Sequence, residues 1–308
     1  MIQKNLFSYS VQKSAHYFVF HDESEPTPNK GWLLIGLLFV KEESKSSVES
    51  VLKQHRRFEN YDGEIHFCEL PKSFEGDFGA KARVARRWMK AYQNGISQDA
   101  LFTCLAVNRA SPKFEHKRFK EDFHAYNRFT AMAIKAGVLW LLQPYGYDII
   151  ELTLVSDGKD RKSRPEQGIV DNFESYLPYR VELDNMMAQS GARRHHPTVK
   201  MRPIQVIASN QSDLLQLTDL LLGGLQTAIV GVSNRPTKRE LARMVSSWYH
   251  DVQCHPHKQR YKMQRKFNVW GFPDEQGKPF NKFSMKISPY PAEQLNLTSV
   301  RIYASLSK

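Results

Sequence analysis

Apolar runs alternate with polar turns along the chain, and their lengths and spacing predict an order of secondary structure. Five runs are rich in β-branched, aromatic and leucine residues over a strand's length: 16–21, 31–40, 100–107, 149–155 and 199–208. Six stretches have helical length or spacing: 44–58, 80–92, 121–142, 166–176, 213–232 and 238–250. Residues 64–67 form a short extended piece. Helices alternate with strands after an initial pair of strands, which predicts an α/β layer with a mixed sheet.

Two apolar runs say more about their surroundings. Residues 31–40 are apolar throughout, which is typical of a central strand covered on both faces. Residues 214–232 are longer but contain Gln216, Asp219 and Gln226, so a buried helix fits better than a membrane span. The first thirteen residues lack an apolar signal core. The expected setting is therefore a reducing cytoplasm, without a membrane partner.

Charge is uneven along the chain. Lys and Arg number 44 against 32 Asp and Glu, which gives a formal charge of +12 and favours polyanionic partners, nucleic acid first. Between residues 258 and 286 the sequence contains eight basic residues and only two acidic ones, and aromatic residues are interleaved with the basic ones. We therefore divide the chain into a main domain, 1–232, and a basic C-terminal extension packed on it, 233–308.

Basic residues in three places are candidates for nucleic-acid binding, although a solvated or packed surface explains each place as well. A helix, a loop and the extension supply them: Lys81, Arg83, Arg86 and Arg87; Arg193 and Arg194; Lys262, Arg265 and Lys266.

Several chemistries are disfavoured. The three cysteines, Cys68, Cys104 and Cys254, are odd in number and contain no CxxC pair, so neither a disulfide scaffold nor a thiolate zinc site is indicated. No feature marks any of these thiols as activated. No glycine-rich phosphate loop follows a strand, and the Gly223-Gly224 pair is expected to allow close helix packing.

Acidic residues at the ends of apolar elements are the informative pattern. Asp22 and Glu23 end the first strand, Asp157 ends the fourth, Glu64 lies in the short extended piece, and Asp219 lies among leucines. Burying an ionised carboxylate without a partner costs several kcal/mol. Carboxylates from different elements can gather only around a cation. Hard oxygen donors favour Mg²⁺ or Mn²⁺, and two such ions about 4 Å apart would clamp a phosphodiester.

Each acid also has a plainer explanation. Asp22 and Asp157 could cap turns after their strands. Glu23 points to the opposite strand face from Asp22, which favours a supporting or surface role. His66 shares a face with Glu64 and could orient water or phosphate, or be an ordinary hydrogen-bonded histidine. Asp219 could pair with a core arginine.

Helical geometry separates the candidates on the last apolar helix. Asp213 and Asp219 lie about 120° apart around its axis, so both are not expected to reach one ion. Gln216 lies about 60° from Asp219, on the same side. We therefore take Asp219 as the ligand, with Asp213 as a spare.

These residues carry a resemblance to a known family. The segments Asp22-Glu23-Ser24, Glu64-Ile65-His66-Phe67, Val155-Ser156-Asp157 and LLQLTDLLLGG from Leu214 resemble the bacterial domain-of-unknown-function family 3800, over residues 15 to 232. The resemblance implies a ribonuclease-H-like mixed five-stranded sheet flanked by helices, with a carboxylate metal site. It implies metal-dependent cutting of DNA or RNA, often in mobile-element or phage-defence settings. Carried over, the metal ligands and catalytic residues are Asp22, Glu64, Asp157 and Asp219. Family members usually have Gly where Glu25 stands, so the turn after residue 24 is expected to differ from theirs, whereas the set of ligands is not.

The leading hypothesis is therefore a Mg²⁺- or Mn²⁺-dependent nuclease. One alternative is a nucleic-acid-binding module without turnover. Another is a structural or partner-binding subunit of a defence or toxin assembly, and a homo-oligomer also stays open. The sequence does not distinguish DNA from RNA, or single from double strands.

Overall fold

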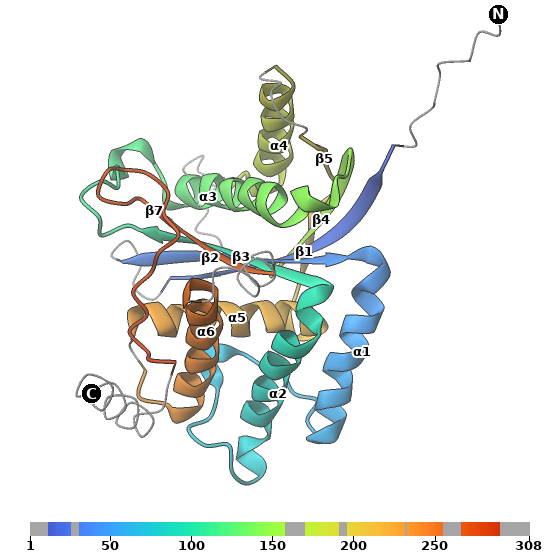
Figure 1. Cartoon of the computed structure of the whole chain (residues 1–308), viewed down its shortest axis with the longest axis vertical. Coiled ribbons are helices and arrows are strands. Elements are labelled where there is room, and N and C mark those ends of the chain that lie inside the picture. The colour runs from blue at the N-terminus through green and yellow to red at the C-terminus, as the bar shows by residue number, and fades with distance from the viewer. Residues whose placement is uncertain are drawn as a thin grey trace, which may run out of the picture.

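A mixed β-sheet runs through the middle of the molecule and carries helices on both faces (Figure 1). The computed structural model describes residues 12–25, 31–157, 170–190, 196–231, 233–254 and 266–289. The strands are β1 (Ser14–Ser24), β2 (Trp32–Lys41), β3 (Ala100–Asn108), β4 (Ile149–Asp157), β5 (Thr198–Met201), β6 (Gln205–Ile207) and β7 (Phe267–Phe272). The helices are α1 (Glu42–Phe58), α2 (Ala80–Asn94), α3 (Asp122–Gly137), α4 (Phe173–Ser190), α5 (Asp213–Val230) and α6 (Pro236–Cys254).

The strand order is β5-β4-β1-β2-β3-β7, and β6 pairs with β4 beyond β5. Strand β2 is antiparallel to β1 and β3, whereas every other pair among the described strands is parallel. The predicted α/β class, a mixed sheet flanked by helices, is confirmed. The apolar run 31–40 is the central strand β2, as expected.

The predicted count of five strands is wrong, because the described sheet has seven. The run 199–208 is divided into β5 and β6, since Pro203 has no N–H to donate to a ladder. Strand β7, within the basic extension, was not expected; it extends the sheet beside β3.

Other element boundaries differ as well. Strand β1 continues past Asp22 to Ser24, so Asp22 and Glu23 lie inside it. The extended piece 64–67 pairs with no described strand and leads into a 3₁₀ turn, Phe67–Glu69. Of the helix expected at 166–176, only the part from Phe173 onward is described as helical.

Each face of the sheet has its own hydrophobic core. Helices α3 and α4 cover one face, where Phe129 and Leu177 pack against the strands. Helices α1, α2, α5 and α6 cover the other face, with α5 lying directly on the sheet (Figure 1). The division of the chain at residue 232 stays a prediction; α6 packs on α5, and β7 belongs to the main sheet.

Helix α5 has clear local start and stop signals. The Ser212 side chain accepts a hydrogen bond from the backbone N–H of Leu215 at its N-terminus. Gly231, at a φ of 77°, ends the helix in the left-handed conformation that glycine tolerates. None of the described helices has the combined length and hydropathy of a membrane span, and the apolar surface of α5 is buried between the sheet and the other helices.

Gly223 and Gly224 let α5 pack closely on two sides, as the sequence suggested. A Cβ at Gly223 would lie 2.2 Å from Cγ of Phe67. A Cβ at Gly224 would lie 3.2 Å from Cγ2 of Val245, on α6. The first contact is far below van der Waals distance and involves the root of the phenyl ring.

We predict that Gly223→Ala destabilises the protein by about 1–3 kcal/mol, because Phe67 must move out of its place on α5. Gly224→Ala is the matched control, expected within about 1 kcal/mol of the parent because alanine favours helices. Urea unfolding of the two variants measures the difference. Equal stabilities would show that Phe67 does not depend on Gly223.

Candidate functional site

Asp22 and Asp157 lie at adjacent positions on neighbouring parallel strands. His21 of β1 pairs with Ser156 of β4, and each aspartate is the next residue along its strand. Side chains alternate along a strand, and Phe20 and Val155 belong to the core beneath α5, so both aspartates face α5. Asp22 is 8% exposed. The two carboxylates therefore share the end of a covered sheet face.

Glu23 lies on the opposite face, as its position in the strand predicted. It accepts a hydrogen bond of 2.9 Å from the hydroxyl of Tyr126, on α3. The same hydroxyl lies 3.3 Å from Nε2 of His21, whose Nδ1 lies 3.0 Å from the Ser156 hydroxyl. Glu23 thus takes part in a polar network on the α3 side, away from the two aspartates.

The segment 64–67 is attached to α5 through two side chains of that helix. Gln216 Oε1 accepts the backbone N–H of Ile65 at 2.8 Å, and Asp219 Oδ2 accepts that of Phe67 at 2.7 Å. The two acceptors are three residues apart on one helix face. The prediction that Gln216 lies on the same side as Asp219 is confirmed. The sequence did not reveal that both side chains bind the backbone of residues 65–67.

His66 lies between the two acids of this segment and helix. Its Nε2 is 3.0 Å from Oε1 of Glu64, and its Nδ1 is 3.5 Å from Oδ2 of Asp219. Asp219 is the main cause that raises the pKa of His66 to about 9, with Glu64 and Glu69 adding to it and burial opposing it. At neutral pH His66 is therefore an imidazolium that lies against both side chains.

Asp213 has a separate role. Its Oδ1 accepts from Nε of Arg56 at 2.8 Å. The arginine is buried, and it also donates to Oε1 of Gln216 at 2.7 Å and to the Gly63 carbonyl at 2.6 Å. Arg56 was missed by the sequence analysis, although it continues the spacing of Val48 and Leu52 on the apolar face of α1.

The acids form two sets in the structure. Asp22 and Asp157 share the sheet face, whereas Glu64 and Asp219 meet at His66. No three His, Cys, Asp or Glu side chains are grouped as metal ligands in the part of the chain that is described, so the four acids do not form a single ligand group there. The expected convergence of all four is not seen.

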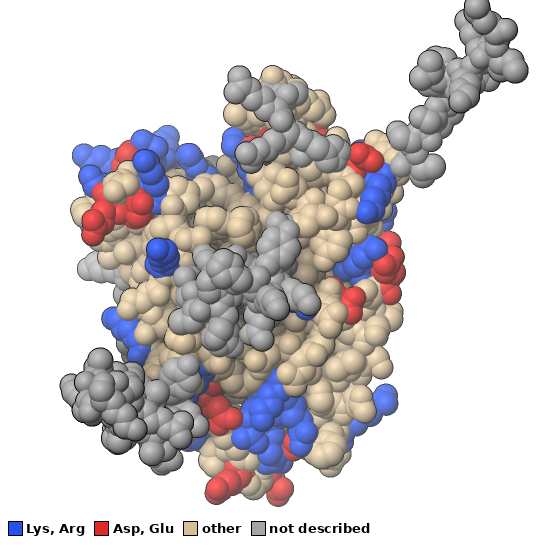
Figure 2. Space-filling view, viewed as in Figure 1, with Lys and Arg blue, Asp and Glu red and all other residues tan. Residues whose placement is uncertain are grey.

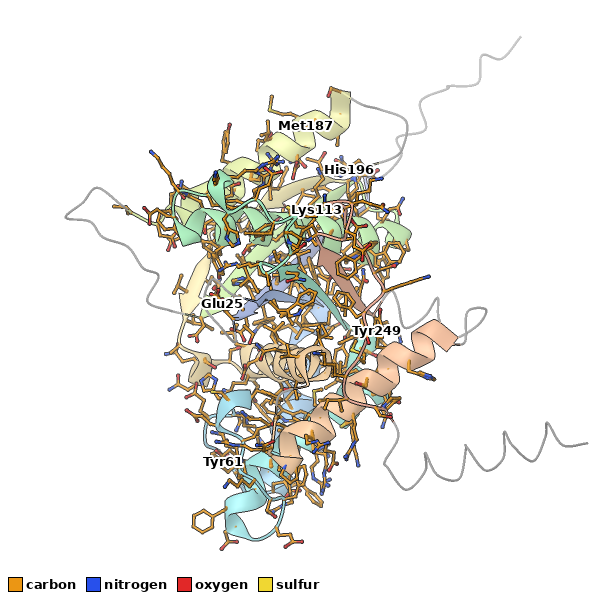
Figure 3. The ribbon with its side chains drawn as sticks, turned by 90° about the vertical axis from the view of Figure 1, so that its left-hand side faces the viewer. Glu25, Tyr61, Lys113, Met187, His196 and Tyr249 are labelled. Carbon is orange, nitrogen blue, oxygen red and sulfur yellow. The ribbon has the colours of Figure 1, made fainter. Side chains whose placement is uncertain are left out.

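The sets are nevertheless connected by a short path. Asp157 pairs with Ile207 of β6, and two residues later the Ser209 carbonyl accepts from Nε2 of Gln216 at 3.0 Å. Asp219 follows less than one helical turn after Gln216. In Figure 3, the labels of Glu25, three residues after Asp22, and Tyr61, three residues before Glu64, both stand in the left half of the view, Glu25 above Tyr61.

The basic residues predicted on α2 are engaged with the chain's own acids. On the face seen in Figure 2, Lys and Arg gather over this region with acidic side chains among them. Arg83 and Arg87 both pair with Glu59 at 2.5 Å. Lys81 pairs with Glu69, and Arg86 lies 3.5 Å from Glu240. Their assignment to nucleic acid stays a prediction.

The remaining basic candidates are mostly not described. Arg193, Arg194, Lys262 and Arg265 lie outside the described residues. The carbonyl of Lys266 accepts hydrogen bonds from the Tyr92 hydroxyl and the Phe102 N–H, which fixes the start of β7.

Two other cations bind the segment that follows Glu64 and His66. Arg235 Nη1 donates to the carbonyls of Cys68 and Leu70 at 3.2 and 2.7 Å. Lys238 Nζ donates to the Cys68 carbonyl at 2.9 Å. The sequence analysis assigned them no role, yet a signal was present: Arg235 directly precedes α6 and Lys238 lies in its first turn, where cations oppose the helix dipole.

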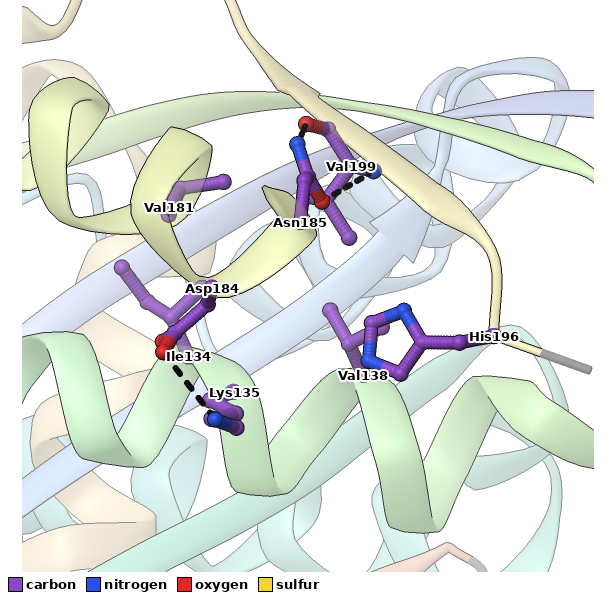
Figure 4. Close-up of a pocket in the computed structure, with 8 residues that line it drawn as sticks. All are labelled: Ile134, Lys135, Val138, Val181, Asp184, Asn185, His196 and Val199. Carbon is purple, nitrogen blue, oxygen red and sulfur yellow. Dashed lines mark hydrogen bonds and ion pairs between the residues drawn. The ribbon is translucent and has the colours of Figure 1, made fainter. Parts of the chain in front are cut away.

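A small cavity lies away from these residues, on the opposite face of the sheet. It has a volume of about 20 Å³ between α3, α4 and β5, with Ile134, Val138, Val181 and Val199 in its lining (Figure 4). The Lys135–Asp184 ion pair lies at its edge. Its volume suffices for little more than one water molecule, so it is no substrate site.

Comparisons with known proteins find similar chains among solved structures. No family model matches the chain, and no curated protein matches it. Among solved structures, the ribonuclease H2 from Pyrococcus horikoshii OT3 matches 81% of this chain and 96% of its own, at 12% identity and a TM-score of 0.35. A mutant of Bst-RNase HIII matches 83% of this chain and 66% of its own, at 9% identity and a TM-score of 0.32. Both TM-scores are below 0.5, so neither likeness establishes a function.

The raised pKa of His66 makes a testable contribution to stability. A group whose folded pKa exceeds its ordinary value of about 6.5 stabilises the folded state fully below that pH, and this stabilisation is lost as pH rises toward about 9. We predict that Asp219→Asn lowers the His66 pKa and flattens the stability change between these pH values. NMR titration and urea unfolding in metal-free buffer measure both effects. An unchanged His66 pKa in the variant would contradict the assignment.

Proposed function

We propose that the chain is a metal-dependent nuclease of the bacterial family 3800, which hydrolyses phosphodiester bonds of DNA or RNA. The observation that carries the proposal is the placement of Asp22 and Asp157 side by side on the sheet face beneath α5. Two adjacent carboxylates on one covered face repel each other unless a cation lies between or beside them. Turn capping, the plainer explanation, does not require this shared face.

The donor chemistry fits a hard divalent cation. Asp22 and Asp157 would hold it, with Glu64 and Asp219 as the further acids predicted from the sequence. Carboxylate oxygens are the ligands that Mg²⁺ and Mn²⁺ prefer, and all four of these side chains are carboxylates. A bound divalent cation supplies Lewis-acid activation of water and of phosphodiester oxygens.

The chain's own residues prepare the second set of acids. The side chains of Glu64 and Asp219 are 35% and 24% exposed, so solvent and dissolved ions can reach both carboxylates. His66 lies between them, with Nε2 3.0 Å from Glu64 Oε1 and Nδ1 3.5 Å from Asp219 Oδ2, and so fixes how the two side chains stand relative to each other. Gln216 fixes the backbone of Ile65 and so sets the position of Glu64.

The partner is proposed to be nucleic acid. The excess of cations across the chain favours a polyanion, and carboxylates next to phosphates would be unfavourable in a protein that only binds. A role in mobile-element or phage defence follows from the family resemblance alone.

We predict that Asp22→Asn and Asp157→Asn reduce metal-dependent cleavage of DNA or RNA to background, because each removes a charge that the cation requires. Glu23→Gln is the matched control, since it changes the same charge on the other face of β1. Gel-based cleavage with Mg²⁺ or Mn²⁺, together with thermal unfolding to verify the fold, gives the comparison.

Three results would count against the proposal. Both aspartate variants could cleave as fast as the parent, or Glu23→Gln could lose cleavage to the same extent. The parent could instead bind nucleic acid in a salt-sensitive manner and fail to cleave it whichever divalent ion is supplied, which would favour the non-catalytic binding module.

A further inference from the structure

Arg235 and Lys238 form a cation pair beside the segment that carries Glu64 and His66. Both donate to the carbonyl of Cys68, which follows directly after Phe67. Lys238 Nζ lies 5.1 Å from the centre of the Phe67 ring, and the Phe67 N–H is bonded to Asp219. The two cations and Asp219 thus contact the same short segment, residues 67–68.

Among the described residues, the side chains of Arg235 and Lys238 donate to backbone carbonyls and form no ion pair with a carboxylate, and both are partly exposed. The α2 cations differ, since Arg83 and Arg87 share the carboxylate of Glu59. Two adjacent, partly desolvated cations repel each other, so their positions favour an anion that approaches from solvent.

The electrostatics of Lys238 agree with this placement. Burial lowers the pKa of Lys238, and the neighbouring Arg235 lowers it further. Cys68 and Asp219 act in the opposite direction, which places the ammonium within electrostatic range of the candidate acid.

From this geometry we infer that Arg235 and Lys238 form a phosphate-binding subsite, which holds a backbone phosphate of the nucleic acid next to Glu64 and Asp219. A phosphodiester carries one negative charge, and the cation pair attracts it to a place that the carboxylates alone would repel. The inference rests on the proposed function, and it names substrate-binding residues on α6 and just before it that the family resemblance does not cover.

The chain offers a well-matched pair of variants. Lys238→Gln removes the charge but keeps an N–H donor for the Cys68 carbonyl. Arg239→Gln removes the same charge from the next residue of α6, which is exposed and lies outside the subsite. Lys238→Arg keeps the charge and tests for rescue.

Binding is measured by fluorescence anisotropy with fluorescein-labelled single-stranded DNA, and RNA of the same sequence, in EDTA so that nothing is cut. We expect Lys238→Gln to bind about tenfold more weakly than the parent. Its slope of log affinity against log salt should fall by about 1, as for the loss of one phosphate contact. Arg239→Gln should match the parent, and Lys238→Arg should restore most of the affinity.

Equal binding by Lys238→Gln and Arg239→Gln would overturn the subsite, even if the parent cleaves nucleic acid. Salt-sensitive binding that depends on Lys238, without cleavage by the parent in any divalent ion, would support the subsite and contradict the nuclease. Absence of binding by the parent to either polymer would overturn both. Thermal unfolding of Lys238→Gln and Lys238→Arg distinguishes a loss of fold from a loss of contact.

Discussion

The backbone of residues 64–67 is hydrogen-bonded to side chains of helix α5 instead of to a neighbouring strand. The candidate site depends on these hydrogen bonds. Ile65 is fully buried, and an unpaired N–H there would cost about 1–3 kcal/mol. Gln216 and Asp219 satisfy the N–H groups of Ile65 and Phe67. Gly223 leaves the space that Phe67 fills one helical turn further on. Because Glu64 and His66 are the neighbours of Ile65 and Phe67 in the chain, the same hydrogen bonds also fix the positions of these two candidate site residues.

The sheet supplies the other half of the arrangement. Parallel pairing of β1 with β4 brings Asp22 beside Asp157, and strand alternation sends Glu23 to the α3 side. Helix α5 covers the aspartate face, and β6 leads from Asp157 toward the start of α5. Residues far apart in sequence are thus placed by two rules, register and alternation, that act on the backbone alone.

Much of this could be predicted because the relevant signals are local. The apolar run 31–40 indicated a central strand, and the 60° between Gln216 and Asp219 indicated a shared helix face. The division of 199–208 could have been expected from Pro203. Other features depend on contacts distant in sequence: β7 was obscured by its basic neighbours, and the pairing of α2 arginines with Glu59 is invisible in composition. The proximity of Arg235 and Lys238 to Cys68 likewise depends on the tertiary fold, because these residues are far apart in sequence.

A crystal of the full chain soaked in Mn²⁺ gives the most direct test of the central claim, that the acids beneath α5 bind a divalent cation. The account predicts an anomalous scattering peak at carboxylate oxygens of Asp22 and Asp157, at about 2.0–2.3 Å, with Glu64 or Asp219 also turned toward it. A peak elsewhere, or a soaked crystal with no manganese at these aspartates, would contradict the account.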